Sequence, residues 1–297
     1  METLISVVVP ATTFSLLIAV GLDLTADDFA RLRERRSLVL AGLFVPVVIL
    51  PPIALGLTAL FDAREDVASA LLLISACPIG GISNAYSYLA RASTALSVTL
   101  TSLSCLCASL TIPLVRQGLE LATGRPLDFL APLPLLVGQL LLMLALPVTI
   151  GMTLRRLSPG SSSRYGPVLQ RVAFIGIGLL FALIIADDFD AFVAGLWTSV
   201  PIIGVFVAGS VVVGWLTASA ITADYRERFT VAAEFGTRNV SIAVAIAVTL
   251  LGRVDFARFA TTYALIEIPL LLGAVAMFRW HQARRGARLP GAPALNA

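Results

Sequence analysis

The sequence alternates long apolar runs with short polar connections, the pattern of a chain whose helices cross a membrane. At about 20 residues for each crossing, the pattern predicts an all-α, polytopic membrane protein with nine transmembrane helices. The expected helices cover residues 4–22, 37–60, 67–91, 94–114, 129–154, 167–186, 192–221, 229–251 and 259–278. We expect residues 281–297 to form a basic cytoplasmic tail.

Two of the predicted helices are interrupted by residues that do not suit a membrane helix. In the third, residues 77–84 read CPIGGISN, where proline removes a main-chain donor and two glycines loosen the next turn. In the eighth, residues 234–239 read EFGTRN, which brings two charged side chains and an amide into an apolar segment. Ionisable groups inside a membrane are costly and indicate function. Two interrupted helices in corresponding halves are typical of a transporter's binding site.

A weak internal repeat supports two related halves. The sequence ADDF at 26–29 follows the first predicted helix, and the same four letters at 186–189 follow the sixth. Asn84 and Asn239, one in each break, are separated by a similar interval. Because the first and sixth helices run in opposite directions in the predicted order, the two copies are expected to be inverted.

Composition and charge agree with a membrane protein. The chain is 58% hydrophobic and 13% charged, which is too apolar for an ordinary soluble domain. Its formal charge of +3 could suggest nucleic acid, but the arginines lie in short loops between the apolar runs, and we expect no nucleic acid. Most of them fall on one side when loops are placed alternately. We therefore expect a cytoplasmic carboxyl end and an outside amino end, in the inner or plasma membrane.

Candidate chemistry gathers around the two breaks. Ser97 and Thr101 are four residues apart in the fourth predicted helix and share one face. Together with Ser83, Asn84 and Glu234, they form an oxygen-only set that suits a hard cation. The alternative is that these hydroxyls bond to carbonyls of their own helix or hold helices together.

The first break is followed by YLAR at 88–91, ALSV at 95–98 and TS at 101–102. With the Glu-x-Gly-x-x-Asn motif of the second break, these motifs resemble the bile acid:sodium symporter family, which includes the apical sodium-dependent bile acid transporter. The resemblance runs over about residues 21–278. It implies inverted five-helix repeats, in which a panel domain moves against a core domain whose two broken helices cross. The chain is similar to members that lack the first helix, which agrees with the nine transmembrane helices predicted above.

The resemblance also divides the predicted helices. It implies a single transporter domain over residues 1–280. The panel helices would be 4–22, 129–154 and 167–186, and the core helices would be 37–60, 67–91, 94–114, 192–221, 229–251 and 259–278.

The family binds two sodium ions near the crossing, and the resemblance implies that one of these sites is retained. Every side chain of the first site has its counterpart here: Ser83, Asn84, Ser97, Thr101 and Glu234. The second site differs, because Arg238 stands where the family has a glutamine, and another glutamine aligns with Pro46. A guanidinium has donors but no lone pair, so it cannot coordinate sodium.

Arg238 therefore needs a role of its own. Our hypothesis is that it supplies the charge of the second ion, with Glu234 or Glu267 as its partner, beside Asn239. It could instead form a purely structural Arg–Glu clamp, or receive a substrate carboxylate in a bidentate pair.

We expect a secondary transporter that moves an organic anion, either a small carboxylate or a bile-acid-like molecule, by alternating access. Sodium would be its coupling ion. Its other partners would be the substrate and the lipid bilayer, and we expect the transporter to be a monomer. Proton coupling through Glu234 and uncoupled passage are alternatives. An arsenite or other oxyanion permease of the same superfamily would use Cys77 and Glu234. An enzyme is not expected, because no Ser/His/Asp set, zinc motif or Walker loop can be assembled.

Overall fold

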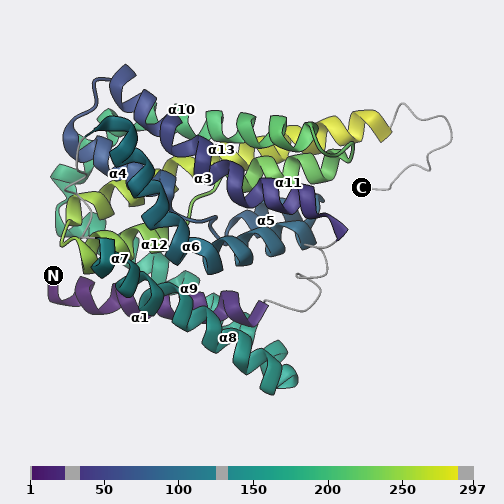
Figure 1. Ribbon diagram of the computed structural model, residues 1–297, viewed down its shortest axis with the longest axis horizontal. Coiled ribbons are helices and arrows are strands. Elements are labelled where there is room, and N and C mark those ends of the chain that lie inside the picture. Colours follow the sequence, from purple (N-terminus) through teal and green to yellow (C-terminus); the bar gives the residue numbers. More distant parts are fainter. Residues whose placement is uncertain (1, 24–33, 125–132, 287–297) are drawn as a thin grey trace.

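The computed structural model describes residues 2–23, 34–124 and 133–286, and every regular element in these ranges is a helix (Figure 1). The helices are α1 Glu2–Asp23, α3 Arg36–Leu60, α4 Glu65–Ala76, α5 Ser83–Leu89, α6 Thr94–Thr123, α7 Leu133–Leu140, η1 Leu141–Ala145, α8 Leu146–Leu157, α9 Pro159–Asp187, α10 Phe189–Ser219, α11 Tyr225–Gly236, α12 Val240–Ala245, η2 Ile246–Leu250 and α13 Val254–Gly286.

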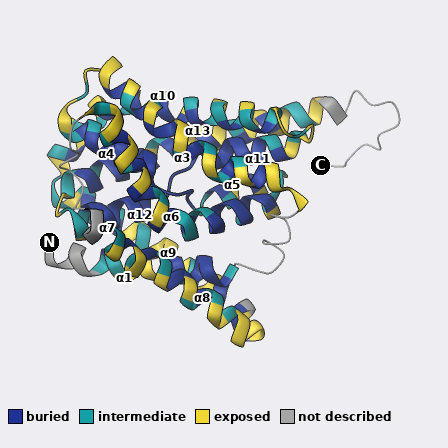
Figure 2. Ribbon diagram, viewed as in Figure 1, coloured by how far each residue is buried: buried dark blue, intermediate teal, exposed yellow. Residues whose placement is uncertain are grey.

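Six segments within these helices are long and apolar enough to cross a membrane, counted over the described ranges. They are Arg36–Leu60, Thr94–Thr123, Val137–Leu157, Arg164–Asp187, Phe189–Ser219 and Val254–Arg284. Two shorter apolar segments, Val8–Asp23 and Val240–Leu250, accompany them. The protein is therefore a multi-pass membrane protein. Large apolar side chains are exposed on its outer faces, whereas buried residues face the centre (Figure 2).

The helices form two groups with a central layer between them. Figure 1 shows α1, α8 and α9 along one side, α3, α10, α11 and α13 along the other, and α5, α6 and α12 between. The first group is held by close backbone approach, since a Cβ on Gly21 of α1 would lie 2.2 Å from the carbonyl oxygen of Val148 in α8. The matching Cβ on Gly151 would lie 2.2 Å from the carbonyl oxygen of Ile18. Small residues permit this approach, as at many membrane helix interfaces.

Both interruptions predicted from the sequence are present. The first lies between α4 and α5, where Cys77 is extended, and the second lies between α11 and α12, where Thr237 is extended. The two breaks meet, because Ile79 and Arg238 form an isolated antiparallel bridge. Two segments that lie about 160 residues apart in the sequence are thus joined.

Several helix ends differ from the prediction. We expected a polar connection after residue 114, but α6 continues to Thr123, because Arg116 forms an ion pair with Glu120 at 3.0 Å and Gly124 ends the helix in a left-handed conformation. The turn expected before residue 167 is helical from Pro159, since proline is favoured in a first helical turn. The expected tail is helical as far as Gly286.

Some sequence predictions fall outside the described residues. These are the first copy of the repeat at 26–29, the loop arginines at 31 and 33, the beginning of the helix expected from 129, and residues 287–297 of the tail.

Candidate functional site

The site is built where the two breaks cross. The carbonyl of Pro78 lies in the first break, outside the helices, and accepts from the N–H of Asn239 at 2.8 Å, and the N–H of Gly80 donates to the carbonyl of Thr237 at 3.3 Å. A Cβ on Gly80 would lie 2.6 Å from the carbonyl oxygen of Arg238, closer than real contacts allow. Glycine at this position therefore lets the two chains touch.

One side of the crossing holds what we call the Glu234 cluster: Ser83 and Asn84 of α5, Ser97 and Thr101 of α6, and Glu234 of α11. The hydroxyl of Ser97 contacts both Asn84 Oδ1, at 2.8 Å, and Glu234 Oε1. The hydroxyl of Thr101 donates to Glu234 Oε2 at 3.0 Å and lies 3.4 Å from Asn84 Oδ1. It also lies 3.2 Å from Ser83 Oγ. Oxygens from three helices thus converge on one point.

This cluster has the chemistry of a site for a hard cation. Ser83, Ser97 and Glu234 are 0% exposed, so the carboxylate is removed from water and surrounded by oxygen atoms. Sodium is a hard cation, and hard cations take carboxylate, hydroxyl and carbonyl oxygens. Across the described residues there is no group of three or more His, Cys, Asp or Glu side chains suited to a metal. The donor set therefore fits sodium better than a transition metal.

Arg238 lies on the other side of the crossing and bonds to main-chain carbonyls. Its Nη2 donates to the carbonyls of Glu234 and Phe235 at 2.9 and 3.1 Å, and its Nη1 donates to the carbonyl of Cys77 at 3.3 Å. These carbonyls belong to the carboxyl ends of α11 and α4, where unpaired carbonyl groups carry partial negative charge. The guanidinium therefore occupies a place that favours a cation.

The partner of Arg238 differs from the carboxylate that we expected from the sequence. Within the described ranges no ion pair joins it to Glu234 or Glu267. The side-chain carboxylate of Glu234 is hydrogen-bonded to the hydroxyls of α6, and only the main-chain carbonyl of Glu234 accepts from the guanidinium. Arg238 Nε is buried and has no hydrogen-bond partner in the part of the chain that the structure describes.

The other two residues named from the sequence have different surroundings. Asn239 caps α12, since its Oδ1 accepts from the N–H of Ile242 at 3.2 Å, and its Nδ2 contacts Cys105 Sγ at 3.7 Å. Glu267 of α13 is 1% exposed and lies beside the hydroxyls of Tyr86 and Thr237. Its Oε1 has no hydrogen-bond partner among the described atoms.

Sequence reasoning missed Tyr86, Thr237 and Tyr263. The hydroxyl of Tyr263 donates to the carbonyl of Gly236 at 3.0 Å and so covers the end of α11. A signal was present for all three, because Thr237 lies inside the second break, Tyr86 lies two residues after the first, and Tyr263 lies four residues, about one helical turn, before Glu267.

Two cavities run along the crossing, between the α1/α9 side and the central helices. One, of about 460 Å³, is lined by Asn84 and Thr101 of the Glu234 cluster. The other, of about 240 Å³, is lined by Arg238 and Glu267. Their shared lining residues, Leu16, Gly81 and Phe174, place them next to each other.

A third, small cavity of about 30 Å³ is lined by both Pro46 and Arg238. The structure therefore brings together the two positions at which the sequence departs from the second sodium site.

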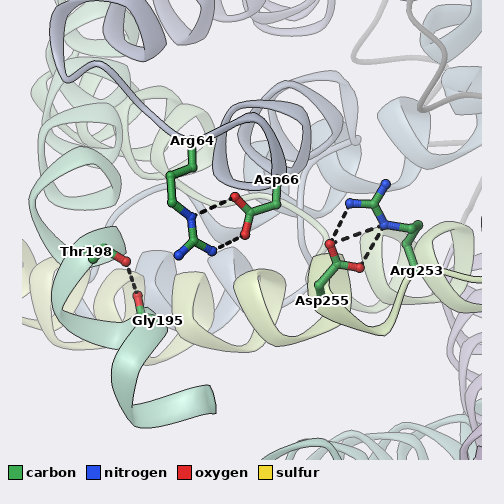
Figure 3. Close-up of polar contacts among 6 residues, drawn as sticks. All are labelled: Arg64, Asp66, Gly195, Thr198, Arg253 and Asp255. Atoms are coloured by element: carbon green, nitrogen blue, oxygen red, sulfur yellow. Dashed lines mark hydrogen bonds and ion pairs between the residues drawn. The ribbon is translucent and has the colours of Figure 1, made fainter.

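A fourth cavity, of about 130 Å³, lies away from the crossing, near the start of α4 and of α13. Figure 3 shows two of its ionic contacts, Arg64 with Asp66 and Arg253 with Asp255. The hydrogen bond from Arg64 lowers the pKa of the Asp66 carboxyl. These pairs are local and exposed, so we do not assign them to the site.

Comparison with known proteins shows the family of this chain. Residues 10–194 match the family described as the sodium bile acid symporter family, and the match covers more than half of the chain. The chain belongs to the sodium bile acid symporter family. Members of this family are sodium-dependent transporters, so the protein is a transporter and not an enzyme. The match includes Ser83, Asn84, Ser97 and Thr101 and ends before the second break.

Individual members of the sodium bile acid symporter family are similar over most of this chain. The uncharacterized sodium-dependent transporter YocS of Bacillus subtilis (strain 168) is 25% identical over 237 residues, which cover 78% of this chain and 71% of that protein. The probable sodium/metabolite cotransporter BASS1, chloroplastic, of Oryza sativa subsp. japonica is 26% identical over 232 residues, covering 78% and 56%. Its Arabidopsis thaliana counterpart is 25% identical, covering 78% and 56%. The chain thus spans little more than half the length of these chloroplast relatives.

Proposed function

We propose that the protein is a secondary transporter that moves an organic anion, coupled to one sodium ion at the Glu234 cluster. The observation that carries the proposal is the crossing itself. On one side, five oxygen-bearing side chains converge on one point, and on the other side Arg238 fills the ends of α4 and α11. The cation at the Glu234 cluster would thus be a diffusible sodium ion, whereas the other positive charge would be the guanidinium of Arg238, which is part of the chain.

The attached cation explains why a single sodium is proposed. Half-helix carboxyl ends and free carbonyls commonly coordinate sodium in broken-helix transporters. Here the guanidinium of Arg238 already donates to three such carbonyls, and it cannot be deprotonated. A second sodium would have to displace it and share the space with its charge.

The membrane arrangement that we propose has nine crossings. It adds α1 and the two broken helices, α4–α5 and α11–η2, to the six long apolar segments, within one transporter domain over residues 1–280 followed by a tail. The panel would be α1, α7–α8 and α9, and the other helices would be the core, related by an inverted repeat. Alternating access would move the two groups against each other, in a monomer of the inner or plasma membrane with its amino end outside and its carboxyl end cytoplasmic.

The proposed substrate is a small carboxylate or a bile-acid-like anion. The two adjoining cavities lie between the proposed panel and core, and their walls are mostly apolar. Arg238 and Asn239 line the second cavity, which gives an anion a positive charge and an amide to bind. Some relatives are named sodium/metabolite cotransporters, which fits a small carboxylate.

We do not propose the oxyanion permease. Cys77 lines the small cavity beside Pro46 and neither of the two larger ones, so a thiol ligand would not face the proposed substrate path.

The test needs two measurements. Thermal stability of the purified protein in sodium and in potassium reports the ion without a substrate, and sodium should raise the melting temperature. Uptake of pantoate, pyruvate and taurocholate into proteoliposomes, with and without an inward sodium gradient, reports coupling. Stability and uptake that are both indifferent to sodium would refute the single-ion proposal.

Arg238→Gln tests the attached cation. If Arg238 replaces an ion, the variant should respond to sodium with a different midpoint or a steeper Hill slope. A sodium response identical to that of the wild type would remove this part of the proposal.

A further inference from the structure

Glu267 is a buried carboxyl group that the sodium site does not use. It lies on α13, is 1% exposed, and lines the same 240 Å³ cavity as Arg238. Its Oε1 has no hydrogen-bond partner within the described residues, and the same holds for the nearby hydroxyl of Tyr86, which is 2% exposed. A buried ionised carboxylate is normally paired or fully hydrogen-bonded. Glu267 is neither.

The groups that face Glu267 do not supply a direct ionic partner. Tyr86 approaches from α5, Thr237 and Arg238 from the second break, and Tyr263 from α13 itself. Arg238 interacts with Glu267 through space, but its two Nη atoms are bonded to carbonyls instead.

Most of the remaining cavity wall is apolar and includes Leu16 of α1, the α9 residues Phe174, Ile177 and Phe181, and Ala264 and Ile268 of α13. Asn239 and Ser241 add an amide and a hydroxyl to this wall, but no charge. On α10, the ring of Phe206 packs on that of Tyr263. A proton is the one cation that a single carboxyl group can bind without further ligands, so this environment suits a proton better than a second metal ion.

Charge balance points the same way. With sodium bound, the charge of Glu234 is cancelled, and Arg238 adds one positive charge. If Glu267 is ionised, the crossing is neutral, and an organic anion would bring an uncompensated negative charge into a region of low dielectric. If Glu267 carries a proton, the crossing has one positive charge, which matches one carboxylate substrate.

We propose that Glu267 is a proton-binding site of the transport cycle, protonated in the sodium-bound state that receives the organic anion. The charge count rests on the proposed sodium and Arg238 assignments, whereas the position of Glu267 in the cavity does not. The proton would come from water in the cavities, bind at Oε1, and return to water when the cavity opens to the other side. Anion transport would then be linked to a proton as well as to sodium.

The test measures the proton directly in the full chain, by infrared spectroscopy of the carbonyl band of protonated carboxyl groups. In wild-type protein with sodium, we expect a band that disappears as the pH is raised. Glu267→Gln should abolish the band, whereas Glu227→Gln, a change in the first turn of α11, should leave the band unchanged. An unchanged band in Glu267→Gln, or no pH-dependent band in the wild type, would overturn the proposal.

A second variant covers the case in which Glu267→Gln does not fold. Tyr86→Phe keeps the ring and removes a hydroxyl that could donate to the ionised carboxylate, so the band should persist to higher pH. An unshifted or lowered midpoint would contradict the assignment. Thermal stabilisation by sodium, measured on the same samples, separates the two proposals: a protein that has the Glu267 band but no sodium response retains the proton site and loses the proposed sodium coupling.

Discussion

The two sides of the crossing each bury a carboxyl group, but they surround it with different hydrogen-bond partners. Glu234 and Glu267 are both carboxyl groups with almost no exposure, yet both oxygens of Glu234 contact hydroxyls of α6, whereas Glu267 Oε1 has no partner in the described part of the chain. Arg238, with its own unpartnered Nε within that part, lies on the side of Glu267. This difference supports the proposal that one side binds a mobile cation, whereas the other side holds the fixed charge of Arg238.

The largest effect that separates the two sides should come from their carboxyl groups. Glu234→Gln removes the only charge of the Glu234 cluster, so sodium affinity should fall by about 100-fold, or about 3 kcal/mol. Glu267→Gln should change it by less than about threefold. The measurement is the sodium concentration that gives half of the thermal stabilisation. Equal losses in the two variants would mean that the two sides form one site.

The next largest effect should come from Gly80, where the two breaks touch. Gly80→Ala would place a methyl group 2.6 Å from a carbonyl oxygen of the second break, where no flexible side chain can yield. Overpacking of this kind costs about 1–3 kcal/mol, so the variant should melt at lower temperature and bind sodium more weakly.

The control for this change is its neighbour. Gly81→Ala adds the same methyl group where no described atom lies within 4 Å, and both glycines have backbone angles that alanine can adopt. Its melting temperature should stay close to that of the wild type. If Gly80→Ala and Gly81→Ala behave alike, the crossing is looser than its hydrogen bonds indicate.

The sequence predicts one side of the crossing far better than the other. Proline, glycine and hydroxyl positions at helical spacing mark the members of the Glu234 cluster between residues 83 and 101, because their effects are local and can be seen within a few residues. Glu234 itself lies more than 130 residues further along the chain and was recognised as a charge inside the second break. The bonds of Arg238 depend on the carboxyl ends of two helices that lie more than 150 residues apart, with one partner at Cys77. No local sequence pattern predicts that these two helix ends lie next to each other.

The helix ends show the same limit. Residues 115–123 are polar enough to predict a loop, but the helix continues to Thr123, supported by an ion pair between Arg116 and Glu120 that a hydropathy pattern does not reveal.

A single hydroxyl of the Glu234 cluster should have an intermediate effect. Thr101→Val keeps the shape and removes the donor to Glu234 Oε2, which leaves a buried carboxylate oxygen with fewer partners and should cost about 1–3 kcal/mol. Thr261→Val is the matched control, because that buried hydroxyl bonds only to the carbonyl of Ala257 in its own helix. Sodium titration of both variants is the check. Weaker sodium binding in Thr261→Val would argue for a general packing effect.

The smallest effect should come from an arginine that resembles Arg238 only superficially. Arg258 of α13 also has a buried Nε without a hydrogen-bond partner in the described residues, but its side chain is 25% exposed. Its Nη2 lies 3.6 Å from Asp188 and 3.9 Å from Asp187, at the end of α9. Partly exposed pairs at such distances contribute about 0–1 kcal/mol. Arg258→Gln should therefore lower the melting temperature only slightly and leave the sodium midpoint unchanged.

Arg238→Gln provides the contrast, because it leaves three carbonyls at two helix ends without their shared cation. Salt makes the distinction sharper. The small loss in Arg258→Gln should shrink further in high potassium chloride, since salt screens exposed charges, whereas the loss in Arg238→Gln should persist because Arg238 is only 3% exposed. If both losses disappear in salt, the charge of Arg238 acts through solvent, and the proposal that Arg238 replaces a buried ion would fail.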